Sequence, residues 1–446
     1  MKHTLALLGL ALSCLLAGCG GSPSALSLRP LYKADEKPVA EPRLEGEWVP
    51  VALSSSGVHQ EKNEHWRVTA QDDGCYQGER RKKDPEKTDQ EENEFYRVCL
   101  MSLDGKLFFD QQLEKQNVGR VMISPKDLAP DVVTLHMAGR LWPQQDLIRL
   151  TRLSGSWIKE NQPEELQMNH GGVVLFTGST AQLRDIMTRH GEDPKAAGPA
   201  WYLCRPNADC RLRVVEDELA REPDDRDILA GAATFYAEIE DYDKMIVLAN
   251  KAAERASPDD ASFARDFVGF ARLLKRDFAG ARSEFAAARK QESQAENQAV
   301  DEAFIGISYF LEGKYAEAHS AFAKPKALPD SSPAVTIILD YATLVRMGRR
   351  KQAESFLADH MARFVGDADE QLLLLRATGR VKDFSPASFT DDELTGGEAA
   401  LYALVRLAKG DRETAREALE RTVKNAAKWS PAYAGAKIEL ERMGTN

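Results

Sequence analysis

Two patterns of apolar residues divide this chain of 446 residues. From residue 44 to about residue 205, short apolar runs alternate with turn residues, as in Tyr96-Arg97-Val98-Cys99-Leu100. Runs of about 4–8 residues rich in β-branched and aromatic side chains are typical of strands, and Asp104-Gly105 between two such runs predicts a hairpin. From residue 206 onward, apolar residues recur at helical spacing. The pattern therefore predicts a β-rich domain over residues 44–205 and a helical domain over residues 206–446.

Two helices are expected to interrupt the strands of the first domain. One begins at Gly155-Ser156-Trp157 and runs to about Met168. The other begins at Ser179 or Thr180, either of which can cap it, and places Leu183, Ile186 and Met187 on one face. About six to eight runs predict strands. The expected fold class is therefore α+β, with a small antiparallel barrel or sandwich.

The helical half contains a repeat. A turn with a small or acidic residue, often followed by an aromatic residue, comes four or five residues before an alanine, or before methionine in one case. The instances are Asp241-Tyr242 with Met245, Asp277-Phe278 with Ala281, Gly313-Lys314-Tyr315 with Ala318, Gly348-Arg349-Arg350 with Ala353, and Gly410-Asp411-Arg412 with Ala415. One helical pair cannot bury its apolar face alone, so pairs must stack. The repeat predicts an all-α solenoid, interrupted between residues 364 and 397 and closed by a terminal helix over residues 432–443.

This repeat resembles the tetratricopeptide (TPR) repeat, whose period is about 34 residues. The resemblance covers about residues 212–443 and implies a surface for protein partners. Tyr236 and Tyr309 occupy corresponding positions of the first helices and are candidate contacts in a concave groove; packing between repeats is the alternative. Arg272 and Arg406 take the same position in other repeats and are candidate polar groove contacts, since arginine fits poorly in a core.

The amino terminus has the layout of a secretory signal. Met1-Lys2-His3 is followed by an apolar run and then by Leu16-Ala17-Gly18-Cys19. The apolar run is too short to span a membrane. The segment resembles a bacterial lipoprotein signal with its lipobox. The resemblance implies that residues 1–18 are removed, that Cys19 carries the lipid, and that Gly20 directs the protein to the outer membrane. Residues 19–43 are then a tether, and an ordinary cleaved signal is the alternative.

Four short motifs support a second resemblance, to a group of uncharacterised bacterial lipoproteins. They are Arg29-Pro30-Leu31-Tyr32, Leu44-Glu45-Gly46-Glu47-Trp48, Gly155-Ser156-Trp157 and Thr177-Gly178-Ser179-Thr180-Ala181-Gln182-Leu183. The resemblance implies a small β domain over about residues 27–195 and no known activity. The Leu-x-Gly-x-Trp motif also resembles the opening of lipocalin-like barrels, where a tryptophan closes one end. Trp48 is therefore expected to be a core residue.

The cysteines outside the signal form an even set in an exported chain, as a disulfide framework requires. They are Cys75, Cys99, Cys204 and Cys210, which allow three pairings. The pairs Cys75–Cys99 and Cys204–Cys210 are favoured because each lies within one local segment. Their spacing does not fit a zinc site, so no metal is expected. Disulfides would place the domain in the periplasm, the oxidising compartment of bacteria.

Composition limits the classes of function. The formal net charge is -11, and the absence of a basic excess argues against nucleic acid as a partner. No HExxH, GxSxG or Walker motif is present, so neither catalytic residues nor a cofactor are expected. The sequence thus favours a lipid-anchored envelope protein, facing the periplasm, whose solenoid binds an envelope protein. Binding of a small apolar ligand or lipid by the β domain is the alternative, and an envelope enzyme is the less favoured third.

Overall fold

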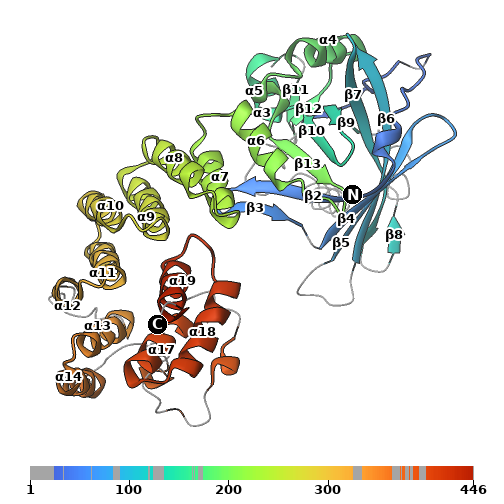
Figure 1. The fold of residues 1–446 in the computed structure, drawn as a ribbon. Helices are drawn as coiled ribbons and strands as arrows, with labels where there is room; N and C mark the ends of the chain where they lie inside the picture. The colour runs from blue at the N-terminus through green and yellow to red at the C-terminus, as the bar shows by residue number, and fades with distance from the viewer. Residues whose placement is uncertain are drawn as a thin grey trace. The chain divides into compact units, whose positions relative to one another are not determined.

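The computed structural model describes residues 25–33, 35–61, 63–83, 91–118, 121–123, 135–162, 164, 166–168, 174–324, 334–363, 372, 374–376, 381, 385–390 and 398–444. The chain forms two compact units, one of residues 1–52 and 58–217 and one of residues 53–57 and 218–446. The first is built mainly of antiparallel strands and the second of helices (Figure 1). This confirms the predicted fold class. Cys19 lies outside the described residues.

Eight antiparallel strands close into a barrel. In spatial order they are β2 (Gly46–Ser54), β4 (Glu64–Ala70), β5 (Tyr76–Lys83), β6 (Glu91–Leu103), β7 (Lys106–Val118), β9 (His136–Pro143), β10 (Leu147–Arg152) and β13 (Ala200–Cys204). Pairing of β7 with β9 and of β13 with β2 completes the ring. Asp104 and Gly105 both have positive φ, at 50° and 73°, in the β6–β7 turn. This confirms the predicted hairpin, because tight hairpin turns favour such residues.

Large side chains fill one half of the barrel. Trp48, Leu100 and Phe109 are fully buried or nearly so, and they pack with Tyr76, Leu141, Ile148 and Leu203. The Trp48 indole donates a hydrogen bond of 2.8 Å to the carbonyl of Leu44, and the Arg205 guanidinium lies 3.8 Å from its ring. Leu44 belongs to a short 3-10 helix, η1 (Pro42–Leu44). Trp48 is therefore a core residue that closes this end of the barrel.

Helices and short strands cover part of the outer surface of the barrel. They are β1 (Leu26–Ser27), α3 (Gly155–Asn161), β11 (Leu166–Met168), β12 (Val174–Phe176), α4 (Thr180–His190) and α5 (Pro194–Ala197). Leu183, Ile186 and Met187 of α4 are buried there, and Ser179 caps the helix as expected. Two further short strands extend the sheet, because β3 (Gly57–Gln60) pairs with β2 and β8 (Val121–Ile123) pairs with β7. The helix expected to reach Met168 ends at Asn161 instead. Pro163 follows in the sequence, and the residue before a proline is disfavoured in a helix.

Part of the predicted tether packs on the barrel. Leu31 is fully buried, and its amide donates a 2.6 Å hydrogen bond to the carboxylate of Asp110. The same carboxylate lies 2.7 Å from Nδ1 of His136. The Arg29-Pro30-Leu31-Tyr32 motif therefore anchors the amino-terminal segment to strands β7 and β9.

Both favoured cysteine pairs are disulfides in the structure. Cys75 and Cys99 lie 4.4 Å apart at their Cα atoms and join the start of β5 to β6. Cys204 and Cys210 lie 6.1 Å apart and join the end of β13 to the residue before α6. The first crosslink closes a loop of 24 residues and restricts the unfolded chain more than the second, whose loop is 6 residues.

The helices follow the sequence repeat. They are α6 (Arg211–Arg221), α7 (Arg226–Glu238), α8 (Tyr242–Ala253), α9 (Pro258–Leu274), α10 (Phe278–Gln291), α11 (Ala295–Glu312), α12 (Tyr315–Ala323), α13 (Ala334–Arg346), α14 (Arg350–Arg363), η4 (Pro386–Ser388), α17 (Glu398–Lys409), α18 (Arg412–Asn425) and α19 (Pro431–Gly444). The turn within each pair contains a residue with positive φ, at Glu240, Arg276, Gly313, Gly348 and Gly410. These left-handed turns reverse the chain between the two helices of each pair, because they end the first helix.

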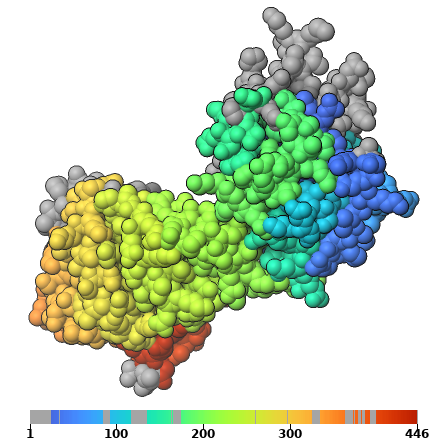
Figure 2. Space-filling view, turned by 90° about the horizontal axis from the view of Figure 1, so that it is seen from above, coloured from blue at the N-terminus to red at the C-terminus, as the bar shows by residue number. Residues whose placement is uncertain are grey.

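Glycine allows the two helices of a pair to approach closely. A Cβ atom added to Gly269 would lie 2.3 Å from the ring of Phe285, and one added to Gly306 would lie 2.5 Å from the ring of Phe322. Both rings are fully buried. Gly269 and Gly306 are therefore crossing points of helices. The space-filling view shows one face of this part of the chain, coloured yellow-green to orange (Figure 2).

Candidate protein-binding face of the helical array

The two candidate tyrosines have different surroundings. Tyr236 on α7 is buried, with its ring edge-on to Phe235 and the Lys244 ammonium 4.6 Å from its centre. Tyr309 on α11 is partly buried beneath the guanidinium of Arg282, 4.2 Å away. Tyr309 also lines a pocket of about 260 Å³ beside Glu302 and Lys324. Tyr309 thus borders a pocket, whereas Tyr236 is buried.

The two candidate arginines interact within their own repeats. Arg272 on α9 forms ion pairs with Asp277 at 2.7 Å and with Glu284 at 3.4 Å. Arg406 on α17 lies over the ring of Tyr402, 4.6 Å from its centre. The structure places all four candidates at the same position of their repeats, four residues before the left-handed turn. Their contacts differ, since Tyr236 and Arg272 meet the second helix or the turn of their own pair, Tyr309 meets α10 of the preceding pair, and Arg406 meets Tyr402 on its own helix.

The terminal helix α19 does more than cap the last pair. It packs against α18 and also against α9 and α11, so it lies on the inner side of the array in Figure 1. Its buried residues Ala434 and Ile438 join the core of α9 and α11. Arg442 donates to the carbonyl of Leu311, and Arg276 pairs with Glu441. Part of the face that a free solenoid would offer to a partner is thus filled by the chain itself.

Polar contacts hold α19 at both ends. Glu240, in the α7–α8 turn, accepts hydrogen bonds from Lys437 at 2.8 Å and from the hydroxyl of Tyr433 at 3.0 Å. The Lys437 ammonium is the main reason that the pKa of Glu240 falls to about 2. Near the other end, Glu439 is only 1 % exposed and pairs with Arg346 of α13 and Arg442. Such contacts fix the register of α19 on the array.

A row of apolar side chains remains exposed on the first helices. Phe263 of α9 is 61 % exposed, Val300 of α11 43 % and Val335 of α13 37 %. Each lies 13 residues before the left-handed turn of its repeat, at Arg276, Gly313 and Gly348. Helices α9, α11 and α13 are neighbours through the contacts of Phe270 with Phe304 and of α11 with α13. We call Phe263, Val300 and Val335 the exposed row.

Two buried carboxyl groups adjoin the exposed row. Asp266 is 9 % exposed and Asp301 3 % exposed, and each has one buried oxygen without a hydrogen-bond partner among the described residues. Burial raises the pKa of Asp266 to about 8, helped by the charge of Asp301, and burial raises that of Asp301 to about 6. Glu292 acts in the same direction on both, while Arg289 opposes it at Asp301. A proton shared by the two carboxyl groups is therefore favoured near neutral pH.

Replacing Asp266 by asparagine is expected to stabilise the array, and more so as the pH rises. The folded state keeps protons on this pair between about pH 4 and pH 8 that the unfolded state has lost, so wild-type stability falls across that window. The Asp266→Asn variant lacks this penalty and should gain roughly 1–3 kcal/mol at pH 8. Urea denaturation at pH 5 and pH 8 measures the free energy of unfolding of the wild type and of the variant. The matched control is Asp359→Asn, an exposed position of α14; an equal change in both variants would contradict the shared proton.

Neither a membrane span nor a metal site is found in the part of the chain that the structure describes. No helix there has the length and apolar character needed to cross a bilayer. No group of three or more histidine, cysteine, aspartate or glutamate side chains there is arranged to hold a metal ion.

Comparison with known proteins gives little further guidance. No protein-family model matches the chain, and no curated protein matches it. One solved structure that matches part of the chain is that of YrrB, described as a TPR protein with an unusual peptide-binding site. The two chains share 14 % sequence identity, the match covers 51 % of this chain and 97 % of YrrB, and the TM-score is 0.27.

The exposure of the row was not predicted from the sequence. Phe263, Val300 and Val335 were indistinguishable from core residues, since apolar residues crowd every first helix of the array. Their shared distance from the turn shows that they occupy the same position of the repeat, but it does not show whether that position is exposed. Which side of a helix faces a neighbour depends on how the pairs stack.

Proposed function

We propose that the helical array is a protein-interaction scaffold whose exposed row receives a partner. The single observation that carries the proposal is the row itself. Exposed apolar residues scattered singly need no explanation, but these three recur at one repeat position on neighbouring first helices. Repeat arrays use such surfaces along neighbouring units for extended contacts with partners.

The charge around the exposed row favours a partner that is apolar with basic residues. Asp266 lies one turn from Phe263 on α9, and Asp301 follows Val300 on α11. A cationic group from a partner would ionise this pair and gain a charge-assisted hydrogen bond. The net charge of -11 also attracts a basic partner, over a longer range.

The test compares proteins captured from solubilised envelopes by three forms of the full chain. The double variant Phe263→Ser/Val300→Ser is expected to lose the partner at least tenfold by quantitative mass spectrometry, since buried apolar anchors dominate binding energy. The control is Val247→Ser, which alters an exposed residue of α8 outside the row (66 % exposed). An identical set of captured proteins for all three forms would exclude the row, and no specific capture by the wild type would exclude a scaffold.

We further propose that the array works in the bacterial envelope, anchored through lipid on Cys19. The lipobox-like run Leu16-Ala17-Gly18-Cys19 supports this, and so do the two disulfides, which form in oxidising compartments. Two or three acyl chains anchor a protein stably, because each buried methylene contributes about 0.8 kcal/mol.

Metabolic labelling with palmitate tests the anchor. The wild-type chain should incorporate label and fractionate with the outer membrane, whereas Cys19→Ser should lose both properties. Cys14→Ser is the matched control, since Cys14 lies within the predicted apolar part of the signal. Label retained in Cys19→Ser would show that the anchor lies elsewhere.

A further inference from the structure

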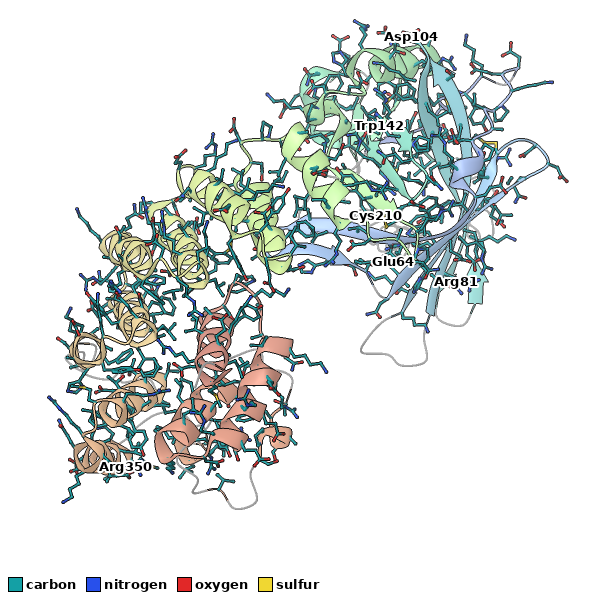
Figure 3. The ribbon with its side chains drawn as sticks, viewed as in Figure 1. Glu64, Arg81, Asp104, Trp142, Cys210 and Arg350 are labelled. Carbon is teal, nitrogen blue, oxygen red and sulfur yellow. A yellow bond between two sulfur atoms is a disulfide. The ribbon has the colours of Figure 1, made fainter. Side chains whose placement is uncertain are left out.

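The barrel has a polar half opposite the half that Trp48 closes. Residues paired directly across antiparallel strands point to the same face. The pairs Trp48–Trp66, Trp66–Arg80 and Arg80–Glu94 therefore place all four side chains inside, with Trp48 already in the filled half. Figure 3 labels Glu64, which is near Arg80 at this end.

Three of the charged groups inside form a closed network. Arg80 donates to both oxygens of Glu64, at 2.8 and 2.9 Å, and to Glu94 at 2.9 Å. The hydroxyl of Tyr96 donates to Glu94 at 2.6 Å, and the Trp66 indole to Glu64 at 2.9 Å. Burial disfavours the charge of Arg80, but the two carboxylates outweigh it and raise its pKa. The network satisfies Arg80 within the protein.

Arg152 lies outside this network. Its pair with Gly139 points it into the barrel, because Gly139 in turn pairs with the inward-facing Phe109. Its guanidinium lies 4.6 Å from the ring of Trp201, and its Nε is buried without a hydrogen-bond partner among the described residues. No described carboxylate forms an ion pair with it, and burial lowers its pKa. The carboxylates of Glu94 and Glu64 act on Arg152 without forming an ion pair with it. A partly buried guanidinium that has no ion-pair partner among the described residues marks a place where an anion would bind.

The interior around Arg152 is reachable from solvent. Several inward-facing side chains keep intermediate exposure, although they point away from the outer surface. They are Trp66, Val68, Val98, Leu150, Arg152 and Trp201. The surface beside Arg152 is thus apolar and partly aromatic, and the buried Tyr76, Leu100 and Phe109 limit how deep a ligand can reach.

We propose that this half of the barrel is a binding site for an aromatic or short-chain monocarboxylate, with the carboxylate on Arg152 and the apolar part against Trp66, Trp201 and Leu150. Arginine presents a planar pair of donors that matches a carboxylate. The filled half of the barrel excludes long chains. The site is independent of the scaffold role of the helical array.

Isothermal titration calorimetry of the purified full-length chain with benzoate and with octanoate tests the site. Both should bind, and Arg152→Met should weaken binding at least tenfold, since a charge-assisted hydrogen bond is lost. Uncharged benzamide should bind at least tenfold more weakly than benzoate. The matched control Arg67→Met, an outward-facing arginine on β4, should leave binding unchanged.

Thermal unfolding separates a binding role of Arg152 from a structural one. Arg152→Met should unfold at the same or a higher temperature, because it removes a partly buried charge that has no ion-pair partner among the described residues. A lower unfolding temperature would assign Arg152 to the structure and overturn the proposal. So would the absence of binding by both carboxylates, equal affinity in Arg152→Met, or equal affinity for benzamide.

Discussion

Gly269→Val is expected to destabilise the helical array by roughly 3 kcal/mol or more, because overpacking a dense core forces backbone shifts. A Cβ atom at this position would lie 2.3 Å from the buried ring of Phe285, and valine adds two methyl groups beyond it. Helices α9 and α10 would have to separate, which would also disturb the ring contacts of Phe285 with Phe270 and Phe304. Urea denaturation followed by circular dichroism at 222 nm measures the loss.

A double variant shows whether the clash with Phe285 is the cause. Phe285→Ala alone should cost about 3–5 kcal/mol through the cavity it leaves. Combined with Gly269→Val, it should cost less than the sum of the two, with a coupling of at least about 1 kcal/mol. Gly435→Val is the matched control, because a Cβ atom at this helical glycine of α19 would meet nothing within 4 Å. Equal losses at Gly269 and Gly435 would show that helix propensity, and not the crossing, is responsible.

Glu439→Ala is expected to loosen α19 from the array. The carboxylate is buried between the guanidinium groups of Arg346 on α13 and Arg442 on α19, at 2.8 Å and 2.5 Å. Its removal leaves two partly buried cations without their shared partner, which should cost roughly 2–4 kcal/mol. Because α19 also covers Phe310 and Leu311, amide hydrogen exchange should quicken in α9 and α11 as well as in α19.

The control for this prediction is on the same helix. Glu441 is 56 % exposed at its side chain and pairs with Arg276 at the surface, so Glu441→Ala should cost less than about 1 kcal/mol. Unchanged exchange in α9 and α11 for Glu439→Ala would mean that α19 is held by its apolar residues and that its polar contacts contribute little.

These two variants also bear on the scaffold proposal. Opening α19 would uncover the inner side of α9 and α11 next to the exposed row. If capture of a partner increases in Glu439→Ala and is still lost in Phe263→Ser/Val300→Ser, the row is the first contact and α19 limits its extent. Capture that is independent of α19 would confine the binding surface to the row.

Local chemistry allowed much of the fold to be predicted. Period-two alternation predicted strands, and Asp104-Gly105 predicted a hairpin because both residues tolerate positive φ. The helix from Gly155 was predicted too long, although Pro163 gave the necessary signal.

The candidate sites were less predictable, because they depend on residues far apart in the chain. Arg152 is one arginine among many in the sequence, and only closure of the barrel places it inside with Trp201 and, among the described residues, without an ion-pair partner. The exposed row depends on how α9, α11 and α13 stack, and the pair Asp266–Asp301 depends on the same stacking. The position of α19 depends on two distant contacts. Glu240 precedes its partner Lys437 by 197 residues, and Arg346 precedes its partner Glu439 by 93 residues.

The sequence by itself determined a β half, a repeating helical half, the paired cysteines and the expectation of a lipid anchor, since each rests on neighbouring residues or on a short period. Only the tertiary structure decided which apolar residues stay exposed, which charges lose their partners and which face of the array the last helix fills. The physical reason is that burial and pairing are properties of surfaces brought together by folding, and residues adjacent in the chain do not define those surfaces.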